Sequence, residues 1–466
     1  MKQTIFREYD IRGIYPEELN ESIAYKIALA YAKYLKKVSG KKNLWVSVGM
    51  DVRKSSPKIQ QGIIDGLLDS QINVVDIGIV PTPLLYFSLF NPVVNEIVVD
   101  GGVMITASHN PAEFNGLKLC VGHSALYGEQ IKEIYKIVVK EEFNKIEKRG
   151  KIEKFDIITP YVYYMIGQFA NLRLMYKNFQ QPKIAVDCGN GTAGIVIGKI
   201  LDMLGIKYYK LYFEPDGNFP NHHPDPTVPK YIKDLIQLVK TKKLWSGIGY
   251  DGDADRVGMV DSKGEPVWGD KLLLLASKYI LEKNKGAKII GEVKCSQVLF
   301  DGIKKFGGKP IIYRTGHSLI KEKMKQENAL LAGEMSGHMF FNDRYFGFDD
   351  AIYSSLRFLE IIGTEQKPLD KIIYFIPRMF NTPEIRVDCP DDKKFKVVET
   401  LKQQIKKLKY DFLDIDGIRV QFNDGGFGLV RASNTQPALV MRFEAKTEKL
   451  LNQHKDFVTG LLKKLL

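Results

Sequence analysis

One order of hydrophobic and polar positions occurs three times along the chain. Each copy has a short apolar run, a loop with Gly or Ser, a segment with apolar residues every three or four positions, and a second apolar run. The copies span residues 45–78, 183–212 and 288–314. This order is typical of a βαβ unit, which buries little surface alone and needs a larger sheet covered by helices. The pattern therefore predicts three similar α/β domains with mostly parallel or mixed sheets.

The hydrophobic pattern changes after about residue 374. Short apolar runs cover residues 418–422 and 427–430, on either side of the sequence Asn-Asp-Gly-Gly, and a third run covers residues 439–445 before a final helical segment. Two such runs joined by a Gly-containing turn are typical of a β-hairpin. We therefore predict a smaller C-terminal α+β domain.

These patterns divide the chain into four predicted domains. The three α/β domains cover residues 1–152, 153–256 and 257–373, and the α+β domain covers residues 374–466. Each domain is long enough to bury its own core.

The composition is that of a folded protein. Of the 466 residues, 44% are hydrophobic and 26% charged, which excludes a disordered chain, a collagen-like repeat and a disulfide-stapled mini-domain. The four cysteines are far apart and form no CxxC pair, as expected for reduced thiols. The N-terminus is too charged for a signal peptide, and no apolar run approaches the roughly 18 residues of a membrane-spanning helix. We therefore expect a soluble cytoplasmic protein.

The net charge of +13 favours anionic partners. Nucleic acid, a membrane surface and a phosphorylated small molecule all meet that description. The lysines cluster at the ends of amphipathic helices, where a solvated helix face is the simpler explanation, and no nucleic-acid motif accompanies them. We expect a small-molecule partner and neither a nucleic acid nor a membrane.

The first motif with candidate chemistry is Thr-Ala-Ser-His-Asn-Pro at residues 106–111, directly after an apolar run. It places the hydroxyl of Ser108 next to the imidazole of His109. A serine needs a base or a polarising environment to act as a nucleophile, yet adjacent side chains on a strand rarely face each other. A polar turn closed by Asn-Pro is the alternative.

The second motif is Asp-Gly-Asp-Ala-Asp-Arg at residues 251–256, between two strand-like runs. The carboxylates of Asp251, Asp253 and Asp255 would repel one another, and a divalent cation removes that repulsion. An EF-hand does not fit, because its sixth and twelfth positions would be Arg and Ser instead of Gly and Glu. The sequence predicts an oxygen-ligand Mg²⁺ site, with an acidic surface turn as the alternative.

The third motif is Gly-Glu-Met-Ser-Gly-His at residues 333–338. Glu334 accepts hydrogen bonds and Ser336 donates or accepts them, which suits the neighbouring hydroxyls of a sugar. His338 could exchange a proton near neutral pH. A purely structural turn remains the alternative. Like His317, His338 is expected in a polar loop rather than in a helix.

The fourth motif, Arg-Ala-Ser-Asn-Thr-Gln-Pro at residues 431–437, lies between two predicted strands of the last domain. It offers a guanidinium group, two hydroxyls, an amide and loop N–H groups in one short segment. Such groups are the usual means of holding a phosphate dianion.

Together these residues resemble the α-D-phosphohexomutase superfamily, most closely its bacterial phosphomannomutase/phosphoglucomutase branch. The resemblance covers the whole chain, and the four motifs occur in the family's order. It also includes residues 6–13, 115–118, 187–191, 216–224, 294–295 and 315–318. Four motifs in one order, one in each predicted domain, make chance similarity a poor explanation. Ala254 departs from the Gly often found there, and Gln436 stands at a variable position.

The resemblance implies four domains around a central cleft and a serine that carries a phosphoryl group. On this basis Ser108, Asp251, Asp253 and Asp255 would hold one Mg²⁺ per chain. Lys118, His317 and His338 are candidates for the proton transfer, and Arg12 and Arg256 join the catalytic set. The substrate-binding set implied by the family consists of Tyr9, Lys294, Glu334, Ser336, Arg431, Ser433, Asn434 and Thr435.

The implied reaction interconverts hexose 1-phosphate and hexose 6-phosphate through a hexose 1,6-bisphosphate, with glucose 1,6-bisphosphate as the activator. The third and fourth motifs resemble the mannose/glucose branch more than the glucosamine-phosphate mutases, so mannose and glucose phosphates are the expected substrates. We expect a monomer, with a dimer as the alternative.

Two other functions compete with this interpretation. A haloacid-dehalogenase-type phosphotransferase would use Asp251 as its nucleophile, but Asp255 occupies the place of the small residue that this class needs. A non-catalytic binder of nucleic acid or sugar phosphate would fit the positive charge, but it predicts decayed catalytic loops. The first function also leaves the serine and phosphate motifs unexplained, and the catalytic loops that the second expects to be decayed are intact.

Overall fold

The structure, a computed structural model, describes residues 1–90, 97–140, 148–433 and 437–465. These residues form two compact units. The first unit contains Met1–Gly269 and Ser336–Ile372, and the second contains Asp270–Met335 and Ile373–Leu466. The first unit contains two mixed sheets, and the second contains an α/β part and an antiparallel sheet.

The first sheet of the first unit is mixed, with the order β1-β5-β4-β2-β3-β7 and β6 paired to β5. β2 runs parallel to β3 and β4, whereas β5 runs antiparallel to β4 and β1. The strands are β1 (Ile11–Ile14), β2 (Trp45–Met50), β3 (Asn73–Ile79), β4 (Gly101–Ile105), β5 (Phe114–Val121), β6 (Ser124–Ala125) and β7 (Ile152–Lys154).

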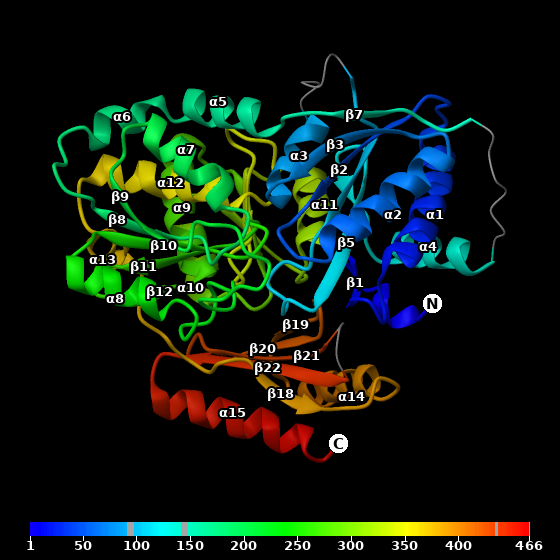
Figure 1. The fold of residues 1–466 in the computed structure, drawn as a ribbon. Helices are drawn as coiled ribbons and strands as arrows, with labels where there is room; N and C mark the ends of the chain where they lie inside the picture. Colours follow the sequence, from blue (N-terminus) through cyan, green and yellow to red (C-terminus); the bar gives the residue numbers. More distant parts are fainter. Residues whose placement is uncertain (91–96, 141–147, 434–436, 466) are drawn as a thin grey trace. The chain divides into compact units, whose positions relative to one another are not determined.

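Four α-helices and a short 3-10 helix accompany this sheet: α1 (Glu21–Ser39), α2 (Ser56–Asp69), α3 (Thr82–Phe90), α4 (Glu129–Lys140) and η1 (Gln3–Ile5). Asn20 caps α1 by accepting a hydrogen bond from the Ile23 amide. α1 and α2 lie side by side (Figure 1), so close that a Cβ on Gly62 would lie 2.3 Å from the Glu21 carbonyl oxygen. Their apolar faces and the sheet form one buried core.

The second sheet of the first unit has the order β12-β11-β10-β8-β9. Its strands are β8 (Ile184–Asp187), β9 (Tyr208–Leu211), β10 (Ser246–Tyr250), β11 (Val257–Asp261) and β12 (Pro266–Val267). β9, β8 and β10 are parallel, and β10, β11 and β12 are antiparallel. The sheet is therefore mixed, and the acidic motif forms the turn between β10 and β11.

The remaining elements of the first unit are mostly helical: α5 (Ile158–Gln168), α6 (Ala170–Tyr176), α7 (Gly194–Met203), α8 (Lys233–Lys242), α12 (Ala351–Glu365), α13 (Leu369–Ile372) and the strand β16 (Met339–Phe341). α12 packs against α6, and Asp350, the residue before α12, caps it by accepting a hydrogen bond from the Tyr353 amide.

The second unit begins with an α/β part. The parallel strands β14 (Lys309–Tyr313), β13 (Lys288–Glu292) and β15 (Leu331–Gly333) lie in that order. The helices of this part are α9 (Gly269–Lys283), α10 (Gln297–Lys305) and α11 (His317–Glu327). The third predicted βαβ copy is therefore present as β13, α10 and β14.

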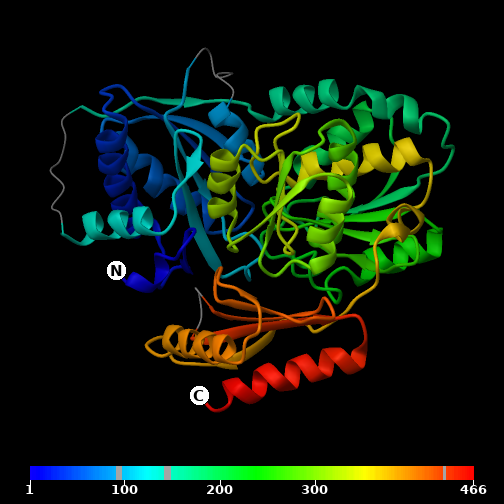
Figure 2. The ribbon, with the colours of Figure 1, turned by 180° about the vertical axis from the view of Figure 1, so that it is seen from behind.

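The rest of the second unit is an antiparallel sheet of order β17-β22-β21-β20-β19, with β18 also paired to β22. Its elements are η2 (Ile373–Phe375), β17 (Phe380–Asn381), β18 (Ile385–Asp388), α14 (Lys394–Lys407), β19 (Phe412–Leu413), β20 (Ile418–Gln421), β21 (Phe427–Ala432), β22 (Ala438–Ala445) and α15 (Glu448–Leu462). Both helices cover one face of this sheet (Figure 2). The β20–β21 pair is the predicted hairpin.

The predicted fold class is confirmed: α/β architecture with mixed sheets, followed by a smaller α+β domain. The four domain boundaries and the central cleft stay predictions. Within the described part of the chain, no helix is both long and apolar enough to cross a membrane.

Candidate active site

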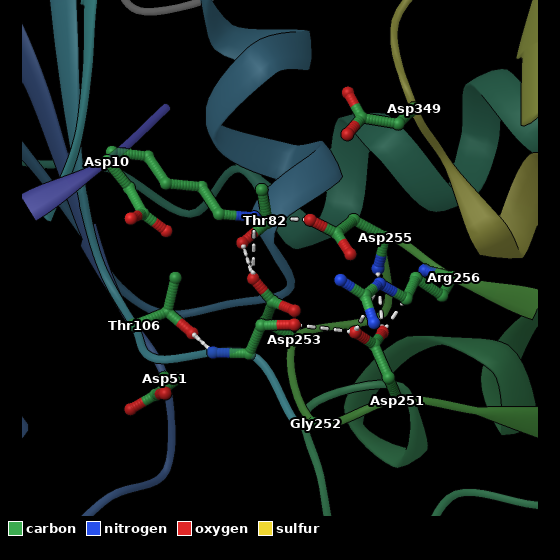
Figure 3. A network of polar contacts seen from close by, with 12 residues as sticks. Asp10, Asp51, Thr82, Thr106, Asp251, Gly252, Asp253, Asp255, Arg256 and Asp349 are labelled. Atoms are coloured by element: carbon green, nitrogen blue, oxygen red, sulfur yellow. Dashed lines mark hydrogen bonds and ion pairs between the residues drawn. The ribbon is translucent and has the colours of Figure 1, made fainter. Parts of the chain in front are cut away.

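Ser108 lies in the loop after β4 and contacts the acidic turn. Its hydroxyl donates to Asp251 Oδ2 at 2.8 Å, and its amide donates to Thr106 Oγ1 at 2.9 Å. Figure 3 labels both partners, Asp251 and Thr106. The side chain of Ser108 also lies 3.1 Å from His109 Nδ1, although adjacent side chains were expected to point apart. The reason is the left-handed backbone of Ser108, with φ of 50°, which takes it off the strand geometry.

The imidazole of His109 is held in its neutral form. Burial lowers its pKa well below the ordinary value, and the guanidinium groups of Arg256 and Arg12 lower it further. Because the single Ser108 hydroxyl proton is donated to Asp251, a neutral ring protonated on Nδ1 can donate a hydrogen bond to Ser108 Oγ.

Arg53, which the sequence analysis missed, holds the backbone of the serine loop. Its guanidinium is almost fully buried. All five of its N–H groups have an oxygen partner at 2.5–3.0 Å, namely the carbonyls of Ser108, Asn110, Pro111 and Phe114 and the Asp51 carboxylate. These contacts fix the loop from behind, so the position of the Ser108 side chain depends on a residue of the preceding βα loop.

The carboxylates of Asp251, Asp253 and Asp255 converge at the β10–β11 turn, and all three are at most 1% exposed. One oxygen from each lies within 4.8 Å of the others. Ala254 adopts the left-handed backbone in this turn, with φ of 58°. That conformation costs an alanine about 1–2 kcal/mol and a glycine almost nothing, which explains why Gly suits this position.

The electrostatics of the turn favour a bound cation. Burial raises the pKa of Asp251 well above its ordinary value, and the charges of Asp255 and Asp253 raise it further. Among the described residues, neither Asp253 Oδ1 nor Asp255 Oδ1 has a hydrogen-bond partner, although both atoms are buried. Buried carboxylate oxygens without partners are costly unless a cation binds them, so this donor set fits a divalent ion that prefers oxygen ligands.

Lys118, on β5, supplies positive charge to the same cluster. Its Nζ lies 3.0 Å from Asp253 Oδ2 and also contacts Asp255. Burial opposes the charge on Lys118, but the two carboxylates outweigh it and raise the pKa of the lysine. Burial likewise opposes the charge on Asp255, and Lys118 holds the pKa of that carboxyl below its ordinary range. Thr82 adds a further contact, donating to Asp253 Oδ2 at 2.6 Å.

Arg256 and His338 lie on the other side of the acidic turn. Arg256 Nε donates to His338 Nε2 at 3.0 Å, and the guanidinium lies 3.9 Å from Asp251. Since Nε2 accepts, the ring proton is on Nδ1, which lies 3.2 Å from Asp349 Oδ2. Asp349 is fully buried and was not predicted as a site residue. With Asp255 it makes a second group of possible metal ligands around His338.

Arg12 joins the serine loop from β1. Its guanidinium donates to Asn110 Oδ1 at 2.9 Å and pairs with Asp10. Tyr9 is half-buried in the segment just before β1.

Ser336 belongs to the first unit and Glu334 to the second, although only one residue separates them in sequence.

The second unit contains the other predicted residues. Glu334 is buried and accepts a hydrogen bond from the Gly316 amide at 2.7 Å. Lys294 Nζ lies 3.2 Å from Glu384 and 3.7 Å from Glu292. Burial opposes its charge, but these two carboxylates outweigh burial and raise the pKa of Lys294.

His317 is the first residue of α11 and not part of a loop, as had been expected. Gly316, with φ of 134°, makes the turn into this helix and leaves His317 as its first residue. The ring is mostly buried.

Arg431 is the second-to-last residue of β21 and pairs with Asp416 at 2.9 Å. Ser433 follows the end of this strand, and Lys394 Nζ donates to the Ser433 carbonyl at 2.5 Å. The predicted residues Asn434 and Thr435 lie outside the described residues. Ser108, the three aspartates, Lys118, Arg12, Arg256 and His338 thus gather in the first unit, whereas Lys294, His317, Glu334 and Arg431 lie in the second.

Four family models match consecutive parts of the chain. They are described as phosphoglucomutase/phosphomannomutase alpha/beta/alpha domain I, domain II and domain III and the C-terminal domain of the same proteins. The matched residues are 3–145, 160–264, 268–379 and 384–461.

Similar proteins carry matching names over nearly their whole length. The phosphomannomutase/phosphoglucomutase of Pseudomonas aeruginosa is 41% identical over 99% of this chain and 96% of its own. The phosphoglucomutase of Neisseria meningitidis serogroup A is 41% identical over 97% of this chain and 96% of its own. A crystal structure of a phosphoglucomutase/phosphomannomutase family protein from Burkholderia thailandensis, 36% identical, matches with a TM-score of 0.91 over 100% of this chain and 98% of that one.

The fold is that of a phosphoryl-transfer enzyme, and its acidic cluster could hold a metal ion. The chain belongs to the phosphoglucomutase/phosphomannomutase family of the α-D-phosphohexomutase superfamily. It is an isomerase that moves a phosphoryl group within a hexose phosphate.

Proposed function

We propose that this enzyme interconverts the 1-phosphates and 6-phosphates of mannose and glucose through a phosphorylated Ser108 and a hexose 1,6-bisphosphate. The observation that carries the proposal is the 2.8 Å contact between the Ser108 hydroxyl and Asp251, within a buried cluster of three aspartates. A serine held against a cation-binding cluster suits transfer of a highly charged phosphoryl group.

In the first transfer, phosphorylated Ser108 gives its phosphoryl group to the free hydroxyl of the bound hexose phosphate. The bond between phosphorus and Ser108 Oγ breaks as a bond from phosphorus to the sugar oxygen forms. The sugar hydroxyl loses its proton, and Ser108 Oγ takes up a proton to become a hydroxyl again. Lys118, His317 and His338 remain the candidates for that proton. Because Lys118 is held in its charged form, it suits a donor better than a base.

The metal ligands in this proposal are Asp251, Asp253, Asp255 and the phosphate on Ser108, around one Mg²⁺ per chain. When bound, the ion offsets negative charge on the transferring phosphoryl group. Arg256 and Lys118 add fixed positive charge at the same place, so the chain itself is preorganised for a charged transition state.

The second transfer needs the bisphosphate to turn end for end. Both of its ends carry phosphate, so the set Arg431, Ser433, Asn434 and Thr435 can hold either one while Ser108 takes back the other. Released bisphosphate leaves Ser108 without its phosphoryl group, which is why glucose 1,6-bisphosphate is the proposed activator. Arg12, Tyr9 and Lys294 would contact the bound sugar phosphate.

Sugar recognition is assigned to Glu334 and Ser336, which would bind two neighbouring ring hydroxyls. If these are the hydroxyls at C3 and C4, neither residue contacts the hydroxyl at C2. Mannose and glucose phosphates, which differ in configuration at C2, would then bind alike. The combined name of the Pseudomonas aeruginosa relative supports this dual specificity.

Turnover of mannose 1-phosphate, glucose 1-phosphate and glucosamine 1-phosphate, measured side by side with Mg²⁺ and a trace of glucose 1,6-bisphosphate, tests the proposal. The kcat/KM values for mannose and glucose phosphates should agree within about tenfold. A hydroxyl that the protein does not contact changes the binding free energy by only about 1 kcal/mol. A dominant glucosamine rate would contradict the assignment of Glu334 and Ser336.

We further propose a cytoplasmic monomer, with a dimer as the alternative, that acts on small hexose phosphates and on neither nucleic acid nor membranes. The four cysteines are buried thiols, which suits a reducing compartment.

A further inference from the structure

Two consecutive residues of the second unit, Thr315 and Gly316, connect three carboxylates. The Thr315 hydroxyl donates to Glu292 Oε2 at 2.7 Å, and the Gly316 amide donates to Glu334 Oε1 at 2.7 Å. The Thr315 amide donates to Asp416 Oδ2 at 3.3 Å. This short segment between β14 and α11 therefore links the proposed sugar-binding Glu334 to Asp416, a residue of the C-terminal α+β part.

Asp416 also contacts the proposed phosphate-binding arginine. The same oxygen, Oδ2, lies 2.9 Å from Arg431 Nη2, and the two side chains are only 7% and 10% exposed. A charge-assisted hydrogen bond at this level of burial is screened little by solvent and fixes the direction of the guanidinium plane. One carboxylate oxygen thus joins Arg431 to the Thr315 segment.

The backbone conformation of the turn at Asp416 determines the position of this carboxylate. Asp416 has φ of 53°, a left-handed conformation that aspartate tolerates better than most residues. The next residue, Gly417, has φ of 108°, and a Cβ there would lie 2.4 Å from the Val430 carbonyl oxygen and 2.8 Å from the Arg431 Cα. The turn before β20 is therefore pressed against the end of β21, next to Arg431.

We propose that Asp416 is a positioning residue that holds Arg431 at a fixed place relative to Glu334, and that it thereby helps to select the hexose phosphates that fit. The inference rests on the proposed function, in which Arg431 binds the phosphate that is not reacting and Glu334 binds the sugar. The spacing between a ring hydroxyl and a phosphate is a property of the substrate. A protein that fixes the matching spacing before binding loses less freedom when the substrate arrives.

The test is Asp416→Asn in the full chain with Mg²⁺ and glucose 1,6-bisphosphate. Asparagine keeps the size and one oxygen acceptor but removes the charge that pairs with Arg431. We expect KM for glucose 1-phosphate to rise about tenfold and kcat to change less than about twofold, because the bond is charge-assisted and acts on binding. Asp424→Asn is the matched control, since it changes a carboxylate that lies 3.2 Å from His454 Nε2 in the same α+β part, and it should leave KM unchanged.

A double variant separates positioning from a purely structural effect. In an Arg431→Ala background, Asp416→Asn should change KM by less than about twofold, since Asp416 acts through Arg431. The inference would be overturned if Asp416→Asn raised KM about tenfold in the Arg431→Ala background as well, or if KM were unchanged in the Asp416→Asn single variant. Neither result would contradict the mutase reaction itself. A wild-type chain without mutase turnover would instead defeat the proposed function, and this inference with it.

Discussion

Ser108→Ala is expected to lower the mutase kcat by at least about 10⁴-fold, the scale seen when an enzyme loses its nucleophile. Without the hydroxyl there is no oxygen to carry the phosphoryl group between the two ends of the sugar. The loss should appear in steady-state assays of glucose 1-phosphate conversion, and intact-protein mass spectrometry should show no phosphorylated species after incubation with glucose 1,6-bisphosphate.

The fold should survive this change, because Ser108 makes its backbone contacts through its amide and carbonyl, which alanine keeps. Ser88→Ala is a matched control: Ser88 is a buried serine of α3 in the same unit, and its hydroxyl donates to the backbone carbonyl of Leu85. Its kcat should stay within about twofold of wild type. Near-wild-type turnover of Ser108→Ala would refute the phosphoserine mechanism.

The second large effect is expected from Asp253→Asn, which removes one negative charge from the acidic turn. Asp253 Oδ1 is a buried oxygen without a hydrogen-bond partner among the described residues, so it is a ready ligand. Cation binding should weaken by at least about 100-fold and kcat should fall about 10³-fold, since a metal ion contributes several kcal/mol to charge stabilisation. Titration with Mn²⁺, followed by electron paramagnetic resonance, measures the binding independently of turnover.

Asp261→Asn provides the control for that experiment. Asp261 is a buried aspartate at the other end of β11, where it accepts hydrogen bonds from the amides of Lys263 and Glu265. This variant should bind Mn²⁺ as the wild type does. If Asp253→Asn also kept wild-type affinity for Mn²⁺, the acidic turn would not be the metal site.

Much of the fold could be predicted from the sequence because the βαβ order recurs. Each predicted strand of the three copies is present, for example residues 288–290 within β13 and 310–313 within β14. The acidic motif was also placed correctly between two strands, since hydrophobic runs on both sides of a polar turn leave few alternatives.

The contacts that support the site could not be predicted in the same way. Arg53 acts through backbone carbonyls of a loop more than 50 residues away, and such carbonyls leave no trace in the sequence. Asp349 and Asp416 lie outside the four motifs, and only the folded chain brings them to His338 and Arg431. The left-handed backbone of Ser108 likewise explains a contact with His109 that strand geometry argues against.

Transfer of labelled phosphate in a single turnover tests the central claim most directly. The enzyme is first phosphorylated with radiolabelled glucose 1,6-bisphosphate, freed of excess label, and then mixed with unlabelled glucose 1-phosphate in a rapid-quench experiment. We expect the label to leave Ser108 with a rate constant at least as large as kcat. It should appear first in glucose 1,6-bisphosphate and then in glucose 6-phosphate. Label that stays on the protein during many turnovers, or that leaves only as inorganic phosphate, would contradict it.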